Sequence, residues 1–295
     1  MRYLCCLAIF FFISFSSFGT AQIPEKLIYN EDTLAMFDCP LSTFPKKNLI
    51  NPKKLFGSSG CFFSGCWRNY VGTWTIVDGK LYLLNIRNAC FPTKVENVSL
   101  YVKSESDKIG HEHADLKKLF RNRFVNGMVF ADWYSGTMYF PKGKLVYYVH
   151  DGFASSYEKE HELIFEKGIL KSEQVFDNSK SKQIEYEFLY QPKDVNGGEA
   201  FLNHIDSLIN WAVLPEIKDS LLRVVVSFSG NELGQVDSVK ILRPCEKIFE
   251  DEAIKVVKSL PATVRYFHGK FVRSYYTLPI RFFESKRKKY LGIIK

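Results

Sequence analysis

Hydrophobic and polar residues alternate in several segments between residues 25 and 190, a pattern that predicts β-strands. The clearest example is the pair of segments Tyr70–Val77 and Lys80–Ile86, which are separated only by Asp78 and Gly79. Asp and Gly tolerate the positive φ angles of a type I′ turn, so we expect these two strands to pair as a hairpin.

Further strands are predicted on both sides of this hairpin. A second hairpin is expected from Gly136–Phe140 and Leu145–Val149, and a third from Tyr157–Phe165 and Ile169–Phe176. The other expected elements are short strands at Leu27–Tyr29, Leu34–Phe37 and Leu100–Val102, and a short helix at His113–Arg123. Antiparallel hairpins in series indicate a mostly β domain. The aromatic share of 16% agrees with this, because aromatic residues favour sheets.

The periodicity becomes helical after a polar boundary at Gln191–Gly198. Phe201, Ile205, Leu208 and Ile209 recur on one face of an expected helix. The elements expected next are strands at Leu221–Phe228 and Gln235–Leu242, a helix at Phe249–Leu260 and a last strand within Phe271–Phe283. The fold class is therefore predicted to be α+β, with the order helix, strand, strand, helix, strand in the C-terminal part.

The N-terminal 21 residues have the pattern of a secretory signal peptide. Arg2 supplies a positive charge, Leu4–Phe15 is apolar, and Gly19–Ala21 places small residues before an expected cut at Gln22. The apolar stretch is shorter than the roughly 20 residues that a membrane-spanning helix needs. We therefore expect an exported protein of the periplasm or cell envelope, or one that is secreted.

Residues 196–283 resemble the TonB C-terminal domain family. The similarity is carried by four segments in the family's order, which are residues 197–201 (GGEAF), 224–236 (VVVSF to GQV), 250–257 (EDEAIKVV) and 278–282 (LPIRF). The family's Tyr-Pro and Trp-x-Pro pairs are absent, and no Pro-rich spacer precedes the segment. The resemblance implies a fold and a bacterial-envelope setting. Residues 65–74 (GCWRNYVGTW) also resemble uncharacterised exported proteins of Bacteroidetes-type bacteria.

These observations divide the chain into four parts: a signal peptide (1–21), a β-rich domain (22–190), a TonB-like domain (191–285) and a basic tail (286–295). The net charge is +8, but the positive residues are scattered and only Lys286–Lys289 forms a dense run. No nucleic-acid partner is expected, and membrane association is expected only if the leader is retained.

Export changes the expected chemistry of the cysteines, because an oxidising compartment favours disulfides. Four of those that follow the leader are close together in the β-rich domain: Cys39, Cys61, Cys66 and Cys90. One or two disulfides among them are expected, and the sequence leaves the connectivity open. No metal site is expected from their spacing.

Two polar groups are candidates for catalysis. His111 and His113, near Asp115, would share a face if they lay on a strand, but a solvated loop before a helix is the preferred interpretation. Asp132, His150 and Asp151 would form an acid–base group if the hairpins brought them together, although no nucleophile is evident beside them. We expect no cofactor, and a secreted hydrolase using Asp132, His150 or His111 is the alternative function.

The last strand is the expected functional surface, because a strand at a sheet edge can accept a strand from a partner. The residues assigned to this edge are Phe271, Val272, Arg273, Tyr275, Leu278 and Ile280. The leading hypothesis is a non-enzymatic envelope protein that binds another protein there, and a homodimer would use the same edge. A TonB-type energy transducer that keeps its leader as an anchor is a further alternative.

Overall fold

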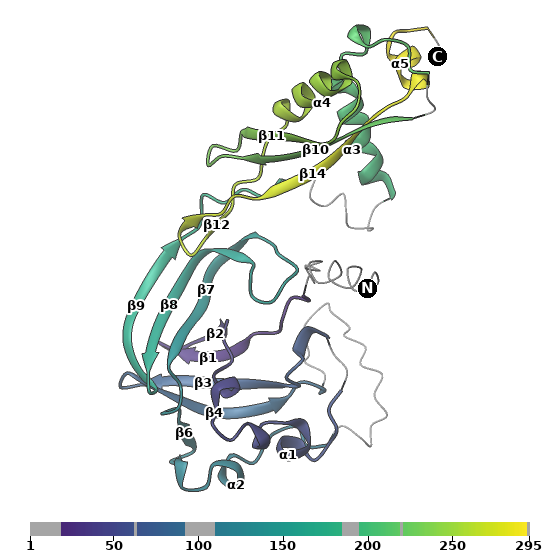
Figure 1. The fold of residues 1–295 in the computed structure, drawn as a ribbon. Coiled ribbons are helices and arrows are strands. Elements are labelled where there is room, and N and C mark those ends of the chain that lie inside the picture. The colour runs from purple at the N-terminus through teal and green to yellow at the C-terminus, as the bar shows by residue number, and fades with distance from the viewer. Residues whose placement is uncertain (1–18, 62–63, 92–109, 185–194, 219–220, 294–295) are drawn as a thin grey trace, which may run out of the picture. The chain divides into compact units, whose positions relative to one another are not determined.

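The computed structural model describes residues 19–61, 64–91, 110–184, 195–218 and 221–293 (Figure 1). Most of the predicted leader and the predicted strand Leu100–Val102 lie outside the described residues. The chain divides into two compact units. Unit 1 contains the residues up to Phe140 together with Val149–Ser155 and Leu163–Glu173, and unit 2 contains Pro141–Tyr148, Ser156–Glu162 and the residues from Gln174.

Nine of the described strands join in one mixed sheet, in the order β2-β1-β3-β4-β9-β8-β7, with β5 and β6 attached to β4. The strands are β1 (Glu25–Tyr29), β2 (Asp32–Met36), β3 (Tyr70–Val77), β4 (Lys80–Asn88), β5 (Phe124–Val125), β6 (Met128–Phe130), β7 (Gly136–Tyr147), β8 (Ser156–Glu166) and β9 (Ile169–Asp177). Strand β1 runs parallel to β3, whereas the pairs β1–β2, β3–β4, β4–β6, β4–β9 and β5–β6 are antiparallel.

Two of the predicted hairpin turns are present. Asp78 and Gly79, with φ angles of 49° and 70°, connect β3 to β4, and Lys167 and Gly168, with φ angles of 50° and 75°, connect β8 to β9. Positive φ at both central residues is the geometry that matches the twist of paired strands. In both segments the alternating pattern and the turn residues therefore predicted the hairpin that the structure has.

The hairpin predicted at Pro141–Lys144 is wrong, because β7 continues through it. Gly143 adopts a φ of 84° beside the side chain of Glu158, and the amide of Lys144 donates a hydrogen bond of 3.0 Å to that carboxylate. Glu158 of β8 thus accepts the backbone hydrogen bond of Lys144 at this irregular position, and β7 continues as a strand instead of turning back.

The core of unit 1 lies on the sheet and includes the fully buried side chains of Trp74, Leu81 and Phe56. Short helices surround it: α1 (Pro52–Phe56), α2 (Leu116–Phe120) and the 3₁₀ turns η1 (Pro40–Thr43), η2 (Lys47–Leu49), η3 (Ser64–Cys66) and η5 (Arg121–Arg123). The helix predicted at His113–Arg123 is therefore shorter than expected. Asp115 caps its start by accepting a hydrogen bond of 2.9 Å from the amide of Lys118.

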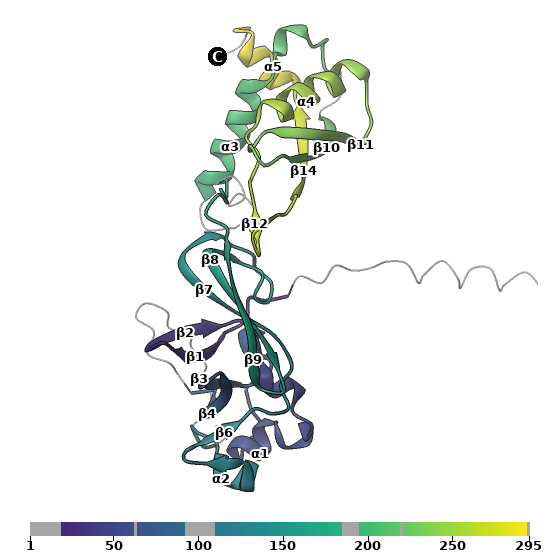
Figure 2. The same ribbon diagram turned by 90° about the vertical axis from the view of Figure 1, so that its left-hand side faces the viewer.

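Unit 2 contains a separate three-stranded antiparallel sheet in the order β11-β10-β14. Its elements are α3 (Val195–Leu208), η7 (Trp211–Val213), β10 (Leu222–Gly230), β11 (Val236–Arg243), α4 (Lys247–Ser259), the β12–β13 hairpin (Tyr266–Phe267 and Lys270–Phe271), β14 (Tyr275–Phe282) and α5 (Glu284–Tyr290). Helix α4 packs on β10 and β11, and Figures 1 and 2 show it lying across them. The α+β fold class is confirmed, including the predicted element order of the C-terminal part.

The structure changes two of the predicted boundaries. Strands β7, β8 and β9 each contribute residues to both units, so the change from one unit to the other falls within these strands and not only at Gln191–Gly198. The predicted basic tail is also folded, since α5 lies beside η7 (Figure 2). Arg287 donates a hydrogen bond of 3.0 Å to the carbonyl of Leu214, and the rings of Tyr290 and Trp211 stack at 5.7 Å.

Candidate functional site

Strand β14 forms one edge of the sheet of unit 2. It pairs with β10 through eight consecutive residue pairs without a register shift, and no described strand pairs with its other side. Alternate side chains face the core, where Ile280 and Phe282 are fully buried. The other set (Tyr275, Thr277, Pro279 and Arg281) points away from the core.

Pro279 indicates which backbone groups of β14 face outward. Proline has no N–H group and is placed in sheets where that position needs no partner, on the outer side of an edge strand. Backbone groups alternate in direction along a strand, so the amides of Tyr275, Thr277 and Arg281 face outward with Pro279. Outside the ladder with β10, no hydrogen bond among the described residues involves these three amides.

The six residues that the sequence assigned to the edge need revision. Phe271 belongs to β13, the amide of Val272 is bonded to the carbonyl of Arg265, and Arg273 pairs with Asp237. Leu278 packs against the core and Ile280 is fully buried in it, so neither side chain is available to a partner. Of the predicted set, Tyr275 keeps an exposed side chain, with an exposed fraction of 71%. The sequence prediction placed Leu278 and Ile280 on the exposed edge, although their side chains lie on the inner face of the strand.

The opposite edge of this sheet, β11, is less regular. Its register with β10 shifts twice, between Val225 and Val226 and between Ser229 and Gly230. Its exposed positions include Asp237, Lys240 and Arg243. Register shifts and charges are the usual means by which proteins protect an edge from strand addition. The register of β14 is regular, and such features occur there only at Pro279 and Arg281, so the Tyr275–Thr277 half of β14 is the less protected part of the two edges.

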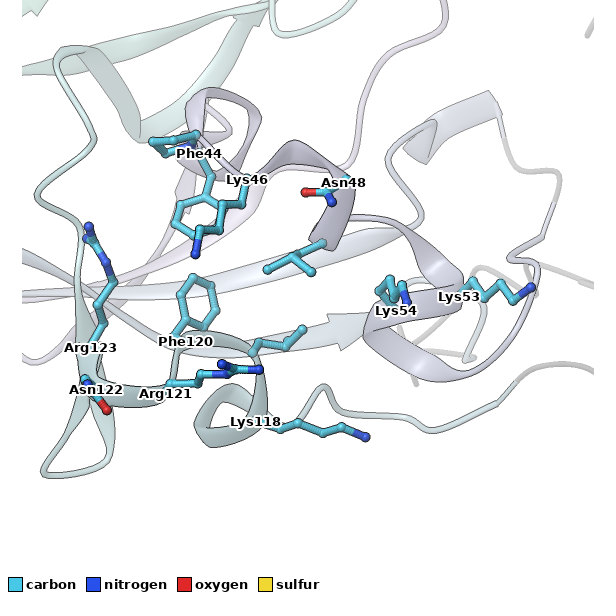
Figure 3. Close-up of a pocket in the computed structure, with 13 residues that line it drawn as sticks. Phe44, Lys46, Asn48, Lys53, Lys54, Lys118, Phe120, Arg121, Asn122 and Arg123 are labelled. Atoms are coloured by element: carbon cyan, nitrogen blue, oxygen red, sulfur yellow. The ribbon is translucent and has the colours of Figure 1, made fainter.

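A second feature is a cavity of about 880 Å³ in unit 1, which we name the basic pocket. One wall is formed by residues 44–54 and the other by residues 118–123 (Figure 3). The rings of Phe44 and Phe120 meet at its base, with centroids 5.2 Å apart. Six cationic residues line it: Lys46, Lys53, Lys54, Lys118, Arg121 and Arg123.

A neighbouring cavity of about 620 Å³ shares Lys53, Lys54 and Lys118 with the basic pocket and extends to His111 and His113. The amide of His111 is bonded to the carbonyl of Phe56, and the ring of His113 lies 3.0 Å from the side-chain amide of Asn85. Within the described residues, no group of three or more His, Cys, Asp and Glu side chains lies in an arrangement that could hold a metal ion.

Two members of the predicted acid–base group, Asp132 and Asp151, contact different residues. Asp132 forms an ion pair with Arg123, whereas Asp151 lies beside Gly19. The ion pair places Asp132 beside Arg123, which lines the basic pocket. The hydrolase hypothesis receives no support from this geometry.

Glu25 on β1 is a fully buried carboxylate of unit 1. Its carboxylate accepts a hydrogen bond from the indole N–H of Trp74, and one of its oxygens lies 3.3 Å from Nε of Arg68. Gly72 makes room for it, since a Cβ there would lie 2.4 Å from a carboxylate oxygen. Burial raises the pKa of Glu25 from 4.5 to about 7, against the opposing effects of Arg68 and Trp74.

The cysteines of unit 1 divide into a disulfide and two thiols. Cys61 and Cys90 are joined, whereas Cys39 and Cys66 are free and lie near Arg68. Burial raises the pKa of the Cys39 thiol to about 12 and also raises that of Cys66. Thiols with raised pKa values are poor nucleophiles at neutral pH, so the geometry gives these two a packing role.

In unit 2 a buried carboxylate was missed by the sequence. Glu160 lies in the predicted strand Tyr157–Phe165, where nothing in the sequence marks it as buried, yet it is only 2% exposed. Its Oε2 lies 3.0 Å from Nδ1 of His268 and accepts a hydrogen bond of 3.1 Å from the amide of that residue. The partner comes from the β12–β13 turn, about a hundred residues away, so no local pattern could indicate it.

The basic pocket was also missed, although a signal for it exists. Lysine pairs stand at residues 46–47, 53–54 and 117–118, and arginines follow at 121 and 123. These short runs were interpreted as scattered charges because residues 55–116 separate the two groups in the chain. Only the fold brings the segments 44–54 and 118–123 to opposite sides of one cavity (Figure 3).

No family model, curated protein or solved structure matched this chain in the comparisons made.

Within the described residues, none of the helices combines the length and hydropathy that crossing a bilayer requires.

Proposed function

We propose that this protein is an exported, non-enzymatic protein of the bacterial cell envelope that binds another protein through the β14 edge. An extended segment of the partner would add to the sheet as a neighbour of β14 and hydrogen-bond to its outward backbone groups. The observation that carries the proposal is the regular edge itself, with the amides of Tyr275, Thr277 and Arg281 unpaired within the described residues.

Two further observations support the proposal. The sequence of residues 196–283 resembles the TonB C-terminal domain family, and the N-terminal residues have the pattern of a signal peptide. Pro279 limits where a partner can pair, because it removes one N–H donor from the outward-facing backbone groups of β14. The added strand is therefore expected to pair with the Tyr275–Thr277 half of β14.

The test uses a matched pair of substitutions at one exposed position. Thr277→Pro removes an outward amide and should abolish strand addition, whereas Thr277→Ala keeps that amide and should preserve it. Because the Thr277 amide does not face β10, both variants should keep the fold, which a thermal melt of each would check.

Binding is measured by capture of envelope proteins on the immobilised mature chain, with a photo-crosslinking residue at Tyr275. The proposal predicts a crosslink to one extended segment of a captured protein with the wild type and with Thr277→Ala, and its loss with Thr277→Pro. Equal crosslinking by both variants would overturn the proposal, since the outward amide would then have no role.

A further inference from the structure

Five of the six cations that line the basic pocket lack acidic partners in the described part of the chain. Lys46, Lys53, Lys54, Lys118 and Arg121 are exposed and form no ion pair with a described residue, whereas Arg123 pairs with Asp132. Five positive charges around one cavity repel one another unless an anion is bound among them. Such an arrangement favours a ligand with several negative charges.

Nearby acidic side chains are engaged elsewhere. Asp115 caps the start of α2, and Glu112 pairs with Arg87 at 3.0 Å. Asp132 forms its ion pair with Arg123. None of these three carboxylates forms an ion pair with the five unpaired cations among the described residues.

The backbone of Arg121 is a second and independent observation. Its φ and ψ angles are 50° and −116°, a region that glycine adopts readily and a residue with a Cβ adopts only under strain. This strained position lies at the end of α2 and presents the guanidinium to the pocket (Figure 3). An arginine at a position suited to glycine indicates that its side chain is needed there.

The shape of the pocket limits the size and kind of ligand. A cavity of about 880 Å³ lies within the range of small-molecule sites. Its base is apolar, with Leu49 and Leu119 half-buried beside the two phenylalanine rings. A ligand is thus expected to place a carbon framework on this base and its charges at the rim.

We propose that the basic pocket binds a phosphate ester that carries several negative charges. A phosphomonoester carries close to two charges at neutral pH and three acceptor oxygens, so one group can engage two or three of the cations. A single carboxylate would leave most of them without a partner. This binding site is separate from the β14 edge and does not depend on the proposed function.

The test measures binding of two probes to the full mature chain. Inositol hexakisphosphate, followed by calorimetry, represents a soluble phosphate ester. Vesicles of phosphatidylcholine with and without phosphatidic acid, followed by co-sedimentation, represent a phosphate ester in a lipid headgroup. Binding should weaken as the salt concentration rises, because exposed charges are screened.

Arg121→Gly is the most informative variant, since it should change stability and binding in opposite directions. Removing the strain should raise the melting temperature, while loss of the guanidinium should weaken probe binding about tenfold. Lys118→Ala should weaken binding about threefold. Lys26→Ala, an exposed lysine of β1 outside the pocket, is the matched control and should bind as the wild type does.

The outcomes separate the two sources of the ligand. Binding of inositol hexakisphosphate alone indicates a soluble ligand, and binding of phosphatidic acid vesicles that Arg121→Gly weakens indicates a lipid headgroup. The proposal is overturned if neither probe binds, if Arg121→Gly binds as tightly as the wild type, or if Lys26→Ala loses as much affinity as Arg121→Gly.

Discussion

In unit 1 the carboxylate of Glu25 lies fully buried between Arg68 and Trp74, and burial raises its pKa to about 7. In unit 2 the carboxylate of Asp237 lies at the surface, and the hydrogen bonds donated by Arg273 lower its pKa. One environment disfavours the charged carboxylate and the other favours it. The two units should therefore respond to pH in opposite directions, and this contrast can be tested separately in each.

The disulfide between Cys61 and Cys90 lies in unit 1. In the described part of unit 2, the cysteine Cys245 is a free thiol. Unit 1 thus combines a buried ion pair with a covalent link. In unit 2, the apolar core around α4 and the three-stranded sheet is accompanied by ion pairs at the surface. Hydrogen exchange of buried amides, at Leu81 and Leu83 in unit 1 and at Val224 and Val226 in unit 2, reports on the units separately.

The largest effect is expected from Arg68→Met. This change leaves the buried Glu25 carboxylate without its cation, and should lower the free energy of unfolding of unit 1 by roughly 3–5 kcal/mol at pH 8. The loss should shrink at pH 5, where Glu25 is already protonated. Hydrogen exchange at the two pH values measures it, and an equal loss at both would argue against the ion pair as the cause.

Opening the Cys61–Cys90 disulfide should come next. The two residues are 29 positions apart, and closing a loop of that length stabilises a fold by about 3.6 kcal/mol. The double variant Cys61→Ser/Cys90→Ser should show this loss in unit 1 and little change at Val224 and Val226. Cys245→Ser is the control. If unit 2 were destabilised as much, the units would unfold together.

The pH dependence of unit 1 follows from Glu25. Its folded pKa lies above the ordinary value of 4.5, so the folded state holds the proton more tightly, and stability falls as the pH rises from 4.5 towards 7. The expected loss between pH 5 and pH 7 is about 2 kcal/mol. Glu25→Gln should remove this slope. A slope that persists in Glu25→Gln would have to come from another group.

The smallest effect is expected in unit 2. Asp237 has a lowered pKa, so its contribution is present above pH 3.8 and is lost as the pH falls through its folded value. Asp237→Asn should therefore reduce the protection of unit 2 slightly at pH 7 and leave it unchanged near pH 2. A loss as large as that of Arg68→Met would remove the contrast between the units.

Local sequence patterns were sufficient where neighbouring residues determine the backbone. Asp78-Gly79 predicted one hairpin and the i, i+4 spacing around Ile205 predicted a helix, and the structure contains both. The same reasoning failed at Pro141–Lys144, where turn-forming residues lie inside a strand because Glu158 of β8 bonds to the Lys144 amide. A hydrogen bond from a neighbouring strand is not visible in a local pattern.

The sequence alone determined the fold class and the order of the C-terminal elements, because hydrophobic periodicity and turn residues act over a few positions. Only the tertiary structure decided which face of β14 is free, which carboxylates are buried, and that lysines and arginines from two distant segments line one cavity. These properties depend on contacts between residues far apart in the chain. Both proposed binding surfaces are of this second kind.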